Sequence, residues 1–333
     1  MANLFDKRFI INTGKGGVGK TTISAAIGLA AARRGKRVLL LDLGAKERIS
    51  RIFGSRPLGY DEIEVEENLF AAHITPDVAL EEYALMKLRL KTIYKAVFEN
   101  RFVRSFLRVI PGLNELTLLG KAWHEEQAVD PDTGKPVWDM IIVDAPATGH
   151  GIFFLQIPDV ITGMITSGPM FREASQISAL IHDPVRTALN LVTLVEEMPV
   201  NETIELKARV DDELKVPLGY VVANSVYSPA FSPSQTRDVD TARERWPRDG
   251  GPVDRMLEAA TFRQQRVELQ RGYLERIDRE IDLPQLRIPY YFTERFDFMT
   301  VSKIADQIER QVAASKRPKG HQGAAMQSAG EGA

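Results

Sequence analysis

Short apolar runs alternate with longer segments of helical pattern along most of the chain. The runs are apolar at nearly every position, which is typical of strands covered by helices on both faces. They lie at residues 9–13, 37–42, 69–74, 140–144, 189–195, 218–224 and 286–289. The helical segments lie at 21–34, within 78–108 and 152–186, at 253–281 and at 301–314. This alternation predicts an α/β fold with a doubly wound, mostly parallel sheet and helices on both faces.

Two stretches break the alternation. Residues 228–252 combine four prolines and a Gly-Gly pair with charged residues, which predicts an irregular excursion between two elements. Residues 313–333 are rich in Gly, Ala, Ser, Lys and Gln and contain no aromatic residue, which predicts a disordered tail. We therefore expect one domain over residues 1–312, with helical insertions at about 78–130 and 152–186.

Composition narrows the function classes. Of the 333 residues 44% are hydrophobic, which is ample material for a core, and the net charge of -2 argues against a specific nucleic-acid-binding protein. The chain has no cysteine, so disulfides, thiolate metal sites and cysteine nucleophiles are excluded. No signal-peptide pattern and no run of about 18 apolar residues is present. We expect a cytoplasmic protein whose contact with membranes is at most peripheral.

The first strand leads into the strongest motif of the sequence, which an alanine-rich helix follows. It is the GxxxxGK[ST] pattern in its strand–loop–helix setting, whose backbone N–H groups surround a phosphate at the start of a helix. The pattern predicts that Lys20 binds the β- and γ-phosphates of ATP and that the Thr21 hydroxyl binds Mg²⁺. A glycine-rich turn without a ligand is the alternative. The expected nucleotide-binding residues of this loop are Gly14, Lys15, Gly16, Gly17, Val18, Gly19, Lys20, Thr21 and Thr22.

A second acidic motif follows an apolar strand at residues 138–143, which ends in Asp144. Beside a phosphate loop, a carboxylate in this position holds Mg²⁺ through water, and the metal offsets the buried charge. An acid after an apolar strand is weak evidence by itself. Together with the phosphate loop it makes Thr21 and Asp144 the candidate metal ligands.

Two stretches resemble a known family. Residues 15–22, with Lys15 directly after the first glycine, resemble the deviant Walker A motif of the MinD/ParA/ArsA group of P-loop ATPases. Residues 144–158, which include Ala-Thr-Gly-His150, resemble switch II of the ArsA/GET branch, the arsenite-pump and tail-anchored-protein targeting ATPases. Weaker likenesses, at 110–115, 196–203, 221–224 and 288–292, extend the resemblance over about residues 5–312.

The resemblance implies a dimer, either of two identical chains or with an ArsA-like paralogue, that encloses two nucleotides. Lys15 would then reach the partner's nucleotide; a lysine that only faces solvent is the alternative. Asn224 would bind the adenine edge, and Pro289 and Tyr290 would close over the base, whereas the alternative is that they only mark strand ends. His150 matches the switch II histidine of the family.

In the tail-anchored-protein targeting branch, helices in these inserted regions build a groove for protein clients. Residues 153–171 are apolar and contain methionines, which suits irregular apolar clients, although a packed core explains them more simply. Residues 87–108 combine basic side chains with aromatic residues at helical spacing, and a core-facing stripe again competes with a partner surface. A protein client is therefore an expected partner of unknown kind.

The sequence departs from the family beside the phosphates. The carboxylate that orients or deprotonates the attacking water aligns with Gly44, whereas Asp42 is retained. Asp42 lies two positions upstream, roughly 6–7 Å away in extended backbone, so we expect it near Thr21 or the Mg²⁺ waters. With Lys15 and Lys20 it completes the candidate catalytic residues. Losing a general base costs on the order of 10²–10⁴-fold in rate. Phosphoryl transfer depends mostly on positioning of the reactants and on charge stabilisation, so we expect a loss at the low end of this range.

Other family devices are absent. Without cysteine the chain has neither the arsenite site nor the zinc clamp of the family, and its five histidines lack metal-ligand spacing.

Three hypotheses about function follow from the sequence. The first is an ATP- and Mg²⁺-dependent ATPase dimer with slow hydrolysis, the second a non-hydrolysing regulatory subunit paired with an active paralogue, and the third, less favoured by charge, a ParA/MinD-type positioning ATPase.

Overall fold

The computed structural model describes residues 3–44, 46–88, 112–146, 151–294 and 296–315. Several predicted features lie outside these ranges. They are the switch II residues 147–150 with His150, residues 89–108 of the basic aromatic segment, and the tail beyond residue 315. None of the described helices has the length and apolarity needed to cross a membrane.

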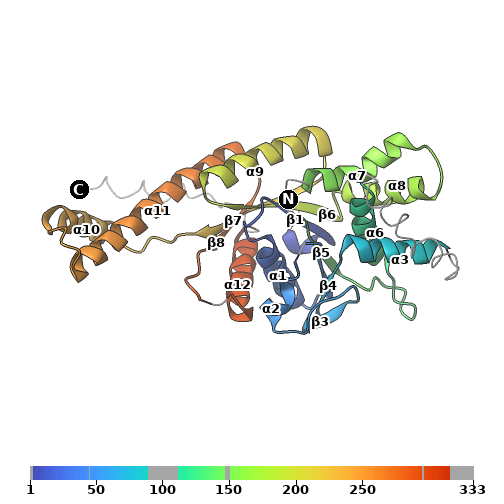
Figure 1. Cartoon of the computed structure of the whole chain (residues 1–333), viewed down its shortest axis with the longest axis horizontal. Coiled ribbons are helices and arrows are strands. Elements are labelled where there is room, and N and C mark those ends of the chain that lie inside the picture. Colours follow the sequence, from blue (N-terminus) through green and yellow to red (C-terminus); the bar gives the residue numbers. More distant parts are fainter. Residues whose placement is uncertain (1–2, 45, 89–111, 147–150, 295, 316–333) are drawn as a thin grey trace, which may run out of the picture.

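The described residues form one eight-stranded sheet in the order β3-β4-β2-β5-β1-β6-β7-β8 (Figure 1). The β3–β4 pair is antiparallel, and every other neighbouring pair is parallel. The strands are β1 (Phe9–Thr13), β2 (Val38–Asp42), β3 (Ile63–Glu66), β4 (Leu69–His73), β5 (Met140–Asp144), β6 (Thr187–Leu194), β7 (Leu218–Val226) and β8 (Gln285–Pro289). The predicted α/β fold with a mostly parallel sheet is confirmed, and only the antiparallel edge strand β3 was not predicted.

Helices cover both faces of the sheet. They are α1 (Lys20–Ala32), α2 (Ile49–Phe53), α3 (Pro76–Leu88), α6 (Leu113–Gln127), α7 (Gly151–Met164), α8 (Pro169–Ile181), α9 (Glu197–Arg209), α10 (Pro233–Arg245), α11 (Pro252–Glu280) and α12 (Phe298–Ser315), with short turns at Leu4–Asp6 and Val210–Leu214. Successive strand residues face opposite sides. On β1, Ile10 packs in the core with α1 and α12, whereas Ile11 packs in the core with α6 to α9.

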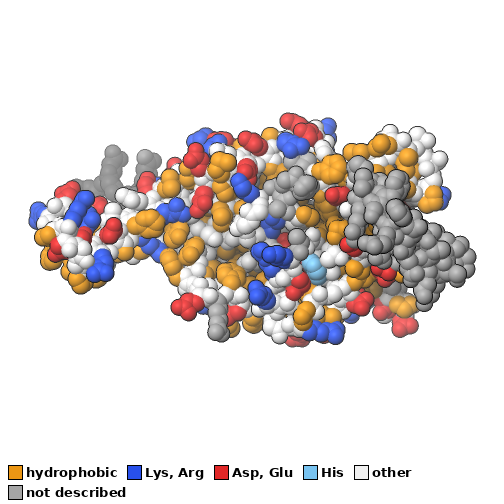
Figure 2. All heavy atoms as spheres, viewed as in Figure 1, with side chains coloured by type: hydrophobic (Ala, Val, Ile, Leu, Met, Phe, Trp, Pro, Cys, Tyr) orange, Lys and Arg blue, Asp and Glu red, His pale blue; other side chains and the backbone are white. Residues whose placement is uncertain are grey.

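Helices α10 and α11 form an arm that extends away from the sheet (Figure 1). The expectation of an irregular excursion at 228–252 was wrong over 233–245, because Ser232 and Gln235 form a capping box that starts α10. No residue of α10 is buried. Figure 2 shows hydrophobic side chains among charged ones along the arm. Helix α12 continues to Ser315, three residues into the range predicted to be disordered.

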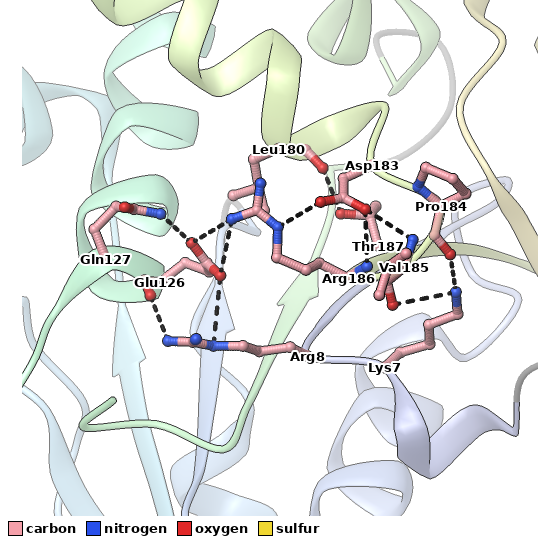
Figure 3. A network of polar contacts seen from close by, with 10 residues as sticks. All are labelled: Lys7, Arg8, Glu126, Gln127, Leu180, Asp183, Pro184, Val185, Arg186 and Thr187. Atoms are coloured by element: carbon pink, nitrogen blue, oxygen red, sulfur yellow. Dashed lines mark hydrogen bonds and ion pairs between the residues drawn. The ribbon is translucent and has the colours of Figure 1, made fainter. Parts of the chain in front are cut away.

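A polar network closes the sheet at the amino ends of β1 and β6 (Figure 3). The Glu126 carboxylate, almost fully buried at the end of α6, lies 3.4 Å from Arg8 Nε and 3.4 Å from Arg186 Nη1. Arg186 Nε also donates to Asp183 Oδ2 at 2.6 Å, which lowers the pKa of Asp183. Lys7 Nζ donates to the Pro184 carbonyl. These pairs tie the start of β1 to α6 and to the α8–β6 turn.

Candidate nucleotide-binding site

The loop between β1 and α1 fits tightly into the edge of the sheet. Gly14 has φ +151°, and a Cβ there would lie 2.1 Å from the Val192 carbonyl oxygen. Gly19 has φ +94°, and its Cβ would lie 2.3 Å from Asn224 Nδ2. Only glycine fits both positions. The loop therefore bends back against β6 and β7 and leads directly into the amino end of α1, where free N–H groups favour an anion.

Lys20 lies over this loop. Its Nζ donates to the carbonyl oxygens of Gly14 at 2.9 Å and of Lys15 at 3.0 Å. Burial lowers the pKa of Lys20, although Asp144 opposes that effect. The ammonium group is thus half-buried and held by neutral carbonyls, which a phosphate would replace as stronger acceptors.

Thr21 and Asp144, the two predicted metal ligands, lie in direct contact. Thr21 Oγ1 donates to Asp144 Oδ2 at 2.5 Å, and Ser24 Oγ donates to Asp144 Oδ1 at 3.2 Å. Both hydroxyls come from the first turns of α1, while Asp144 ends β5. The phosphate loop and the second acidic motif therefore meet at one edge of the sheet.

Asp42 pairs in register with Asp144 on the neighbouring strand. Burial raises the pKa of Asp144 to about 7, and the charge of Asp42 adds to the effect despite the Thr21 hydrogen bond. Burial likewise raises the pKa of Asp42, which the Gly44 N–H opposes. Two buried carboxyl groups side by side disfavour double ionisation, so they titrate as a pair. The charge of Lys20 lowers the pKa of Asp144 but does not outweigh burial.

Asp42 turns toward Gly44. Its Oδ1 accepts a hydrogen bond from the Gly44 N–H at 2.9 Å, and its Oδ2 lies 3.5 Å from His73 Nδ1. Neither Asp42 Oδ2 nor His73 Nδ1 has a hydrogen-bond partner in the described residues. A Cβ at position 44 would lie 2.9 Å from Asp42 Oδ1. A side chain there would therefore displace the Asp42 carboxylate.

The residues present fit Mg²⁺. The Thr21 hydroxyl and the Asp144 carboxylate are hard oxygen donors of the kind this ion prefers. Nearby, the buried Asp42 Oδ2 is unpartnered among the residues that the structure covers. Thr21 and Asp144 would hold the ion, which would offset the charge of the carboxylate pair and of a phosphate.

Lys15 points to α9 of its own chain. Its Nζ forms an ion pair with Glu202, and both side chains are about one-third exposed, at 39% and 36%. Glu202 belongs to the stretch 196–203 that resembles the family. The single chain thus holds the ammonium of Lys15 beside the phosphate loop through an acid 187 positions away in sequence.

The residues expected at the adenine base lie at the ends of β7 and β8. Asn224 Nδ2 donates to the Val18 carbonyl oxygen at 2.9 Å, so it holds the phosphate loop. Tyr290 follows Pro289 and stacks on Tyr227, with ring centroids 4.8 Å apart and planes 10° apart. Arg263 of α11 lies over the Tyr227 ring at 5.5 Å. Asn224 therefore contacts the loop, Tyr290 packs against Tyr227 beyond the end of β7, and their binding of a base remains a prediction.

Four polar residues of the site were not predicted. Ser24 contacts Asp144, His73 faces Asp42, Glu202 pairs with Lys15, and Asn12 donates to Ser24 Oγ at 2.9 Å. Asn12 left a signal in the sequence, because it interrupts an apolar strand. The partners of the others are distant in sequence and carry no local signal.

Together the parallel sheet, the glycine-rich loop and the Lys20–Thr21–Asp144 geometry define a P-loop nucleotide-binding fold. Residues 7–168 match the family model described as anion-transporting ATPase. Over this range the chain is similar to ATPases of the ArsA type.

Three proteins to which the chain is similar are named as ATPases. The ATPase BagA of Mycobacterium tuberculosis is 34% identical over 223 residues, which cover 65% of this chain and 64% of BagA. The arsenical pump-driving ATPase of Escherichia coli is 30% identical over 217 residues, which cover 58% of this chain and 35% of that protein. That of Acidiphilium multivorum is 30% identical over 233 residues, which cover 62% and 36%. The chain thus spans less than two thirds of the length of these relatives.

Proposed function

We propose that the protein is an ATP-binding, Mg²⁺-dependent ATPase of the ArsA type. The observation that carries the proposal is the meeting of Lys20, Thr21 and Asp144 at the mouth of the glycine-rich loop. Lys20 neutralises phosphate charge, the loop N–H groups bind phosphate oxygens, and Thr21 and Asp144 hold Mg²⁺. Mg²⁺, when bound, supplies charge stabilisation for phosphoryl transfer. Calorimetric titration with ATP and Mg²⁺ tests this; a folded protein that gives no binding heat would overturn it.

The working form that we propose is a dimer enclosing two nucleotides, with Lys15 acting on the partner's phosphates. The exposed position of Lys15 beside the loop supports this role, because its flexible side chain can exchange Glu202 for a phosphate. The state of the nucleotide would order or release switch II and so alter a surface for a protein client. Analytical ultracentrifugation with and without ATP and Mg²⁺ tests the dimer; a monomer under both conditions would contradict it.

Hydrolysis in this proposal is slow, since Gly44 carries no carboxylate. Asp42 is held by the Gly44 N–H and does not replace one. Gly44→Asp should raise steady-state phosphate release roughly 100-fold, the lower end of the range for a general base. Gly44→Asn, which displaces Asp42 similarly without adding a base, is the matched control. Equal rates in the two variants would show that the missing carboxylate does not limit turnover.

The alternative is a regulatory subunit that binds ATP without hydrolysing it and pairs with an active paralogue. Gly44 is the observation that favours this alternative. It predicts stable, Mg²⁺-dependent ATP binding with no phosphate release above that of a Lys20→Ala control over several hours. Phosphate release by the unmodified chain, abolished in Lys20→Ala, would reject it.

A further inference from the structure

A row of buried polar side chains crosses the sheet beneath the phosphate loop. Asn12 on β1 lies in register with Asp144 on β5 and with Asn190 on β6. Both asparagines are fully buried, and Asp144 is 3% exposed. Buried amides in the middle of apolar strands are costly unless they are hydrogen-bonded. Here they are bonded to one another, which calls for a role beyond packing.

The direction of hydrogen bonding along this row is set at one end. The backbone N–H of Tyr220 can only donate, and it donates to Asn190 Oδ1 at 2.9 Å. Asn190 must then turn its Nδ2 group to Asn12, whose Oδ1 accepts at 2.9 Å. Asn12 Nδ2 in turn donates to Ser24 Oγ at 2.9 Å. An amide that accepts on one side donates on the other, so each bond fixes the next.

Ser24 ends the row at the metal ligand. Its oxygen is occupied by the Asn12 donor, so its own proton is directed to Asp144 Oδ1, 3.2 Å away. Asp144 Oδ2 remains for Thr21 on the side of the phosphate loop. The carboxylate is thus fixed by a donor on each oxygen, and the orientation of the Ser24 donor is set by the Tyr220 N–H on β7, three strands away from β5.

Space has been made for this arrangement. A Cβ on Gly219 would lie 2.4 Å from Asn190 Oδ1 and 3.2 Å from the Ala188 Cβ. Any larger residue at position 219 would push the Asn190 amide away from the Tyr220 N–H. Position 219 of β7 therefore requires a residue without a side chain, because Asn190 Oδ1 occupies the space beside it.

We infer that Asn190 and Asn12 are positioning residues for Mg²⁺ binding, acting through Ser24 on the orientation of Asp144. The inference rests on the proposed function. Without Asn190, the Asn12 amide is free to turn over and present its oxygen to Ser24. Ser24 would then donate to Asn12 and turn a lone pair toward Asp144, which repels the carboxylate. The loop and Lys20 do not take part in the row, so binding of ATP without metal is left intact.

The test compares ATP affinity with excess EDTA and with saturating Mg²⁺, measured by calorimetry on the full chain. The quantity of interest is the ratio of the ATP affinity with Mg²⁺ to the ATP affinity in EDTA. Asn190→Ala should lower this ratio roughly tenfold, the lower range for groups that orient a metal ligand. Its ATP affinity in EDTA should stay within about twofold of the wild type.

Thr187→Ala is the matched control. Thr187, the first residue of β6, is also fully buried, but its hydroxyl donates to the Leu180 carbonyl oxygen at 2.6 Å and takes no part in the row. It should lower thermal stability without changing the ratio. If Asn190→Ala does not fold, Ser24→Ala carries the test, because it removes the last donor of the row.

The outcomes separate the inference from the proposed function. A ratio within twofold of the wild type in Asn190→Ala or, where that variant does not fold, in Ser24→Ala would overturn the inference. So would an equal loss of affinity in EDTA and in Mg²⁺, which would indicate a displaced loop. A wild-type chain that binds no ATP under either condition would instead overturn the proposed function. A lowered ratio with Thr187→Ala unchanged supports the positioning role.

Discussion

The two ends of the central strands treat buried charge in opposite ways. At the amino ends, the Glu126 carboxylate lies between Arg8 and Arg186, so a buried negative charge is matched by positive ones (Figure 3). At the carboxyl ends, Asp42 and Asp144 lie side by side with raised pKa values. The buried carboxylate is thus neutralised at the end of the sheet that has only a structural role. The carboxyl pair at the other end is where Mg²⁺ would supply positive charge.

This difference separates structural from functional polar groups. Polar groups in a folded core normally find partners, and strained or unpaired ones gather at functional sites. Within the described part of the chain, both Asp42 Oδ2 and Arg8 Nε lack a hydrogen-bond partner, but Arg8 Nε lies 3.4 Å from the Glu126 carboxylate and so still faces an opposite charge. We expect variants at the two ends to change stability in opposite directions.

The largest effect should come from Asp144 in the protein without metal and nucleotide. Its pKa is raised from 3.8 to about 7, so the folded state holds a proton that the unfolded chain has released between those values. Stability should therefore fall as pH rises across that window, by roughly 4 kcal/mol in all and about 3 kcal/mol between pH 5 and pH 8, and level off above it. Urea unfolding in EDTA at pH 5 and pH 8 measures this. Asp144→Asn should be less dependent on pH and more stable than wild type at pH 8; parallel curves would contradict the raised pKa.

Neutralising Glu126 should lower the free energy of unfolding, whereas neutralising Asp144 at pH 8 should raise it. Glu126→Gln leaves Arg8 and Arg186 facing each other without an acid, although their partial exposure screens the repulsion. We expect a loss of about 2 kcal/mol, below the 3–5 kcal/mol typical of fully buried broken pairs. Urea unfolding at pH 7 measures it, and ATP affinity should be unchanged. If Glu126→Gln were more stable than the wild type, the proposed difference between the amino and carboxyl ends of the strands would be wrong.

The smallest effect on stability should come from the Lys15–Glu202 pair, which is exposed. Glu202→Gln should change stability by no more than about 0.5 kcal/mol, since such pairs contribute little. Because Lys15 is then free to meet a partner's phosphate, ATP-dependent self-association should strengthen by roughly two- to fivefold. Sedimentation at several concentrations measures it. Glu205→Gln, which removes the same charge from an exposed position of α9, is the control, and equal shifts would mean that only net charge matters.

Much of the fold was predictable from hydrophobic pattern. Strands β1 and β5 have the predicted bounds, because each begins with a run of apolar residues and ends at a recognisable motif. Strand β3 was missed since its four residues, Ile-Glu-Val-Glu, alternate and form a short edge pair. Helix α10 was missed because Pro233 at its first turn looks like a breaker in sequence, whereas the structure uses it as a helix start.

The site was predictable only as far as local motifs extend. The loop residues follow one another, and Asp144 ends an apolar strand, so both were visible. The partners that orient them were not, since Asn190 is 178 positions from Asn12 and Glu202 is 187 from Lys15. An asparagine within an apolar strand signals that a partner exists, but only the strand order shows which one.

The absence of a side chain at Gly219 predicts which second-site mutations can suppress a defect at that position. Gly219→Ala should impair the protein by crowding Asn190, although position 219 lies outside the phosphate loop and the second acidic motif. A second change that shortens the neighbour, such as Asn190→Ser, should relieve the crowding and act as an intragenic suppressor of folding defects. Suppressors of that kind should recover stable protein without recovering the response to magnesium.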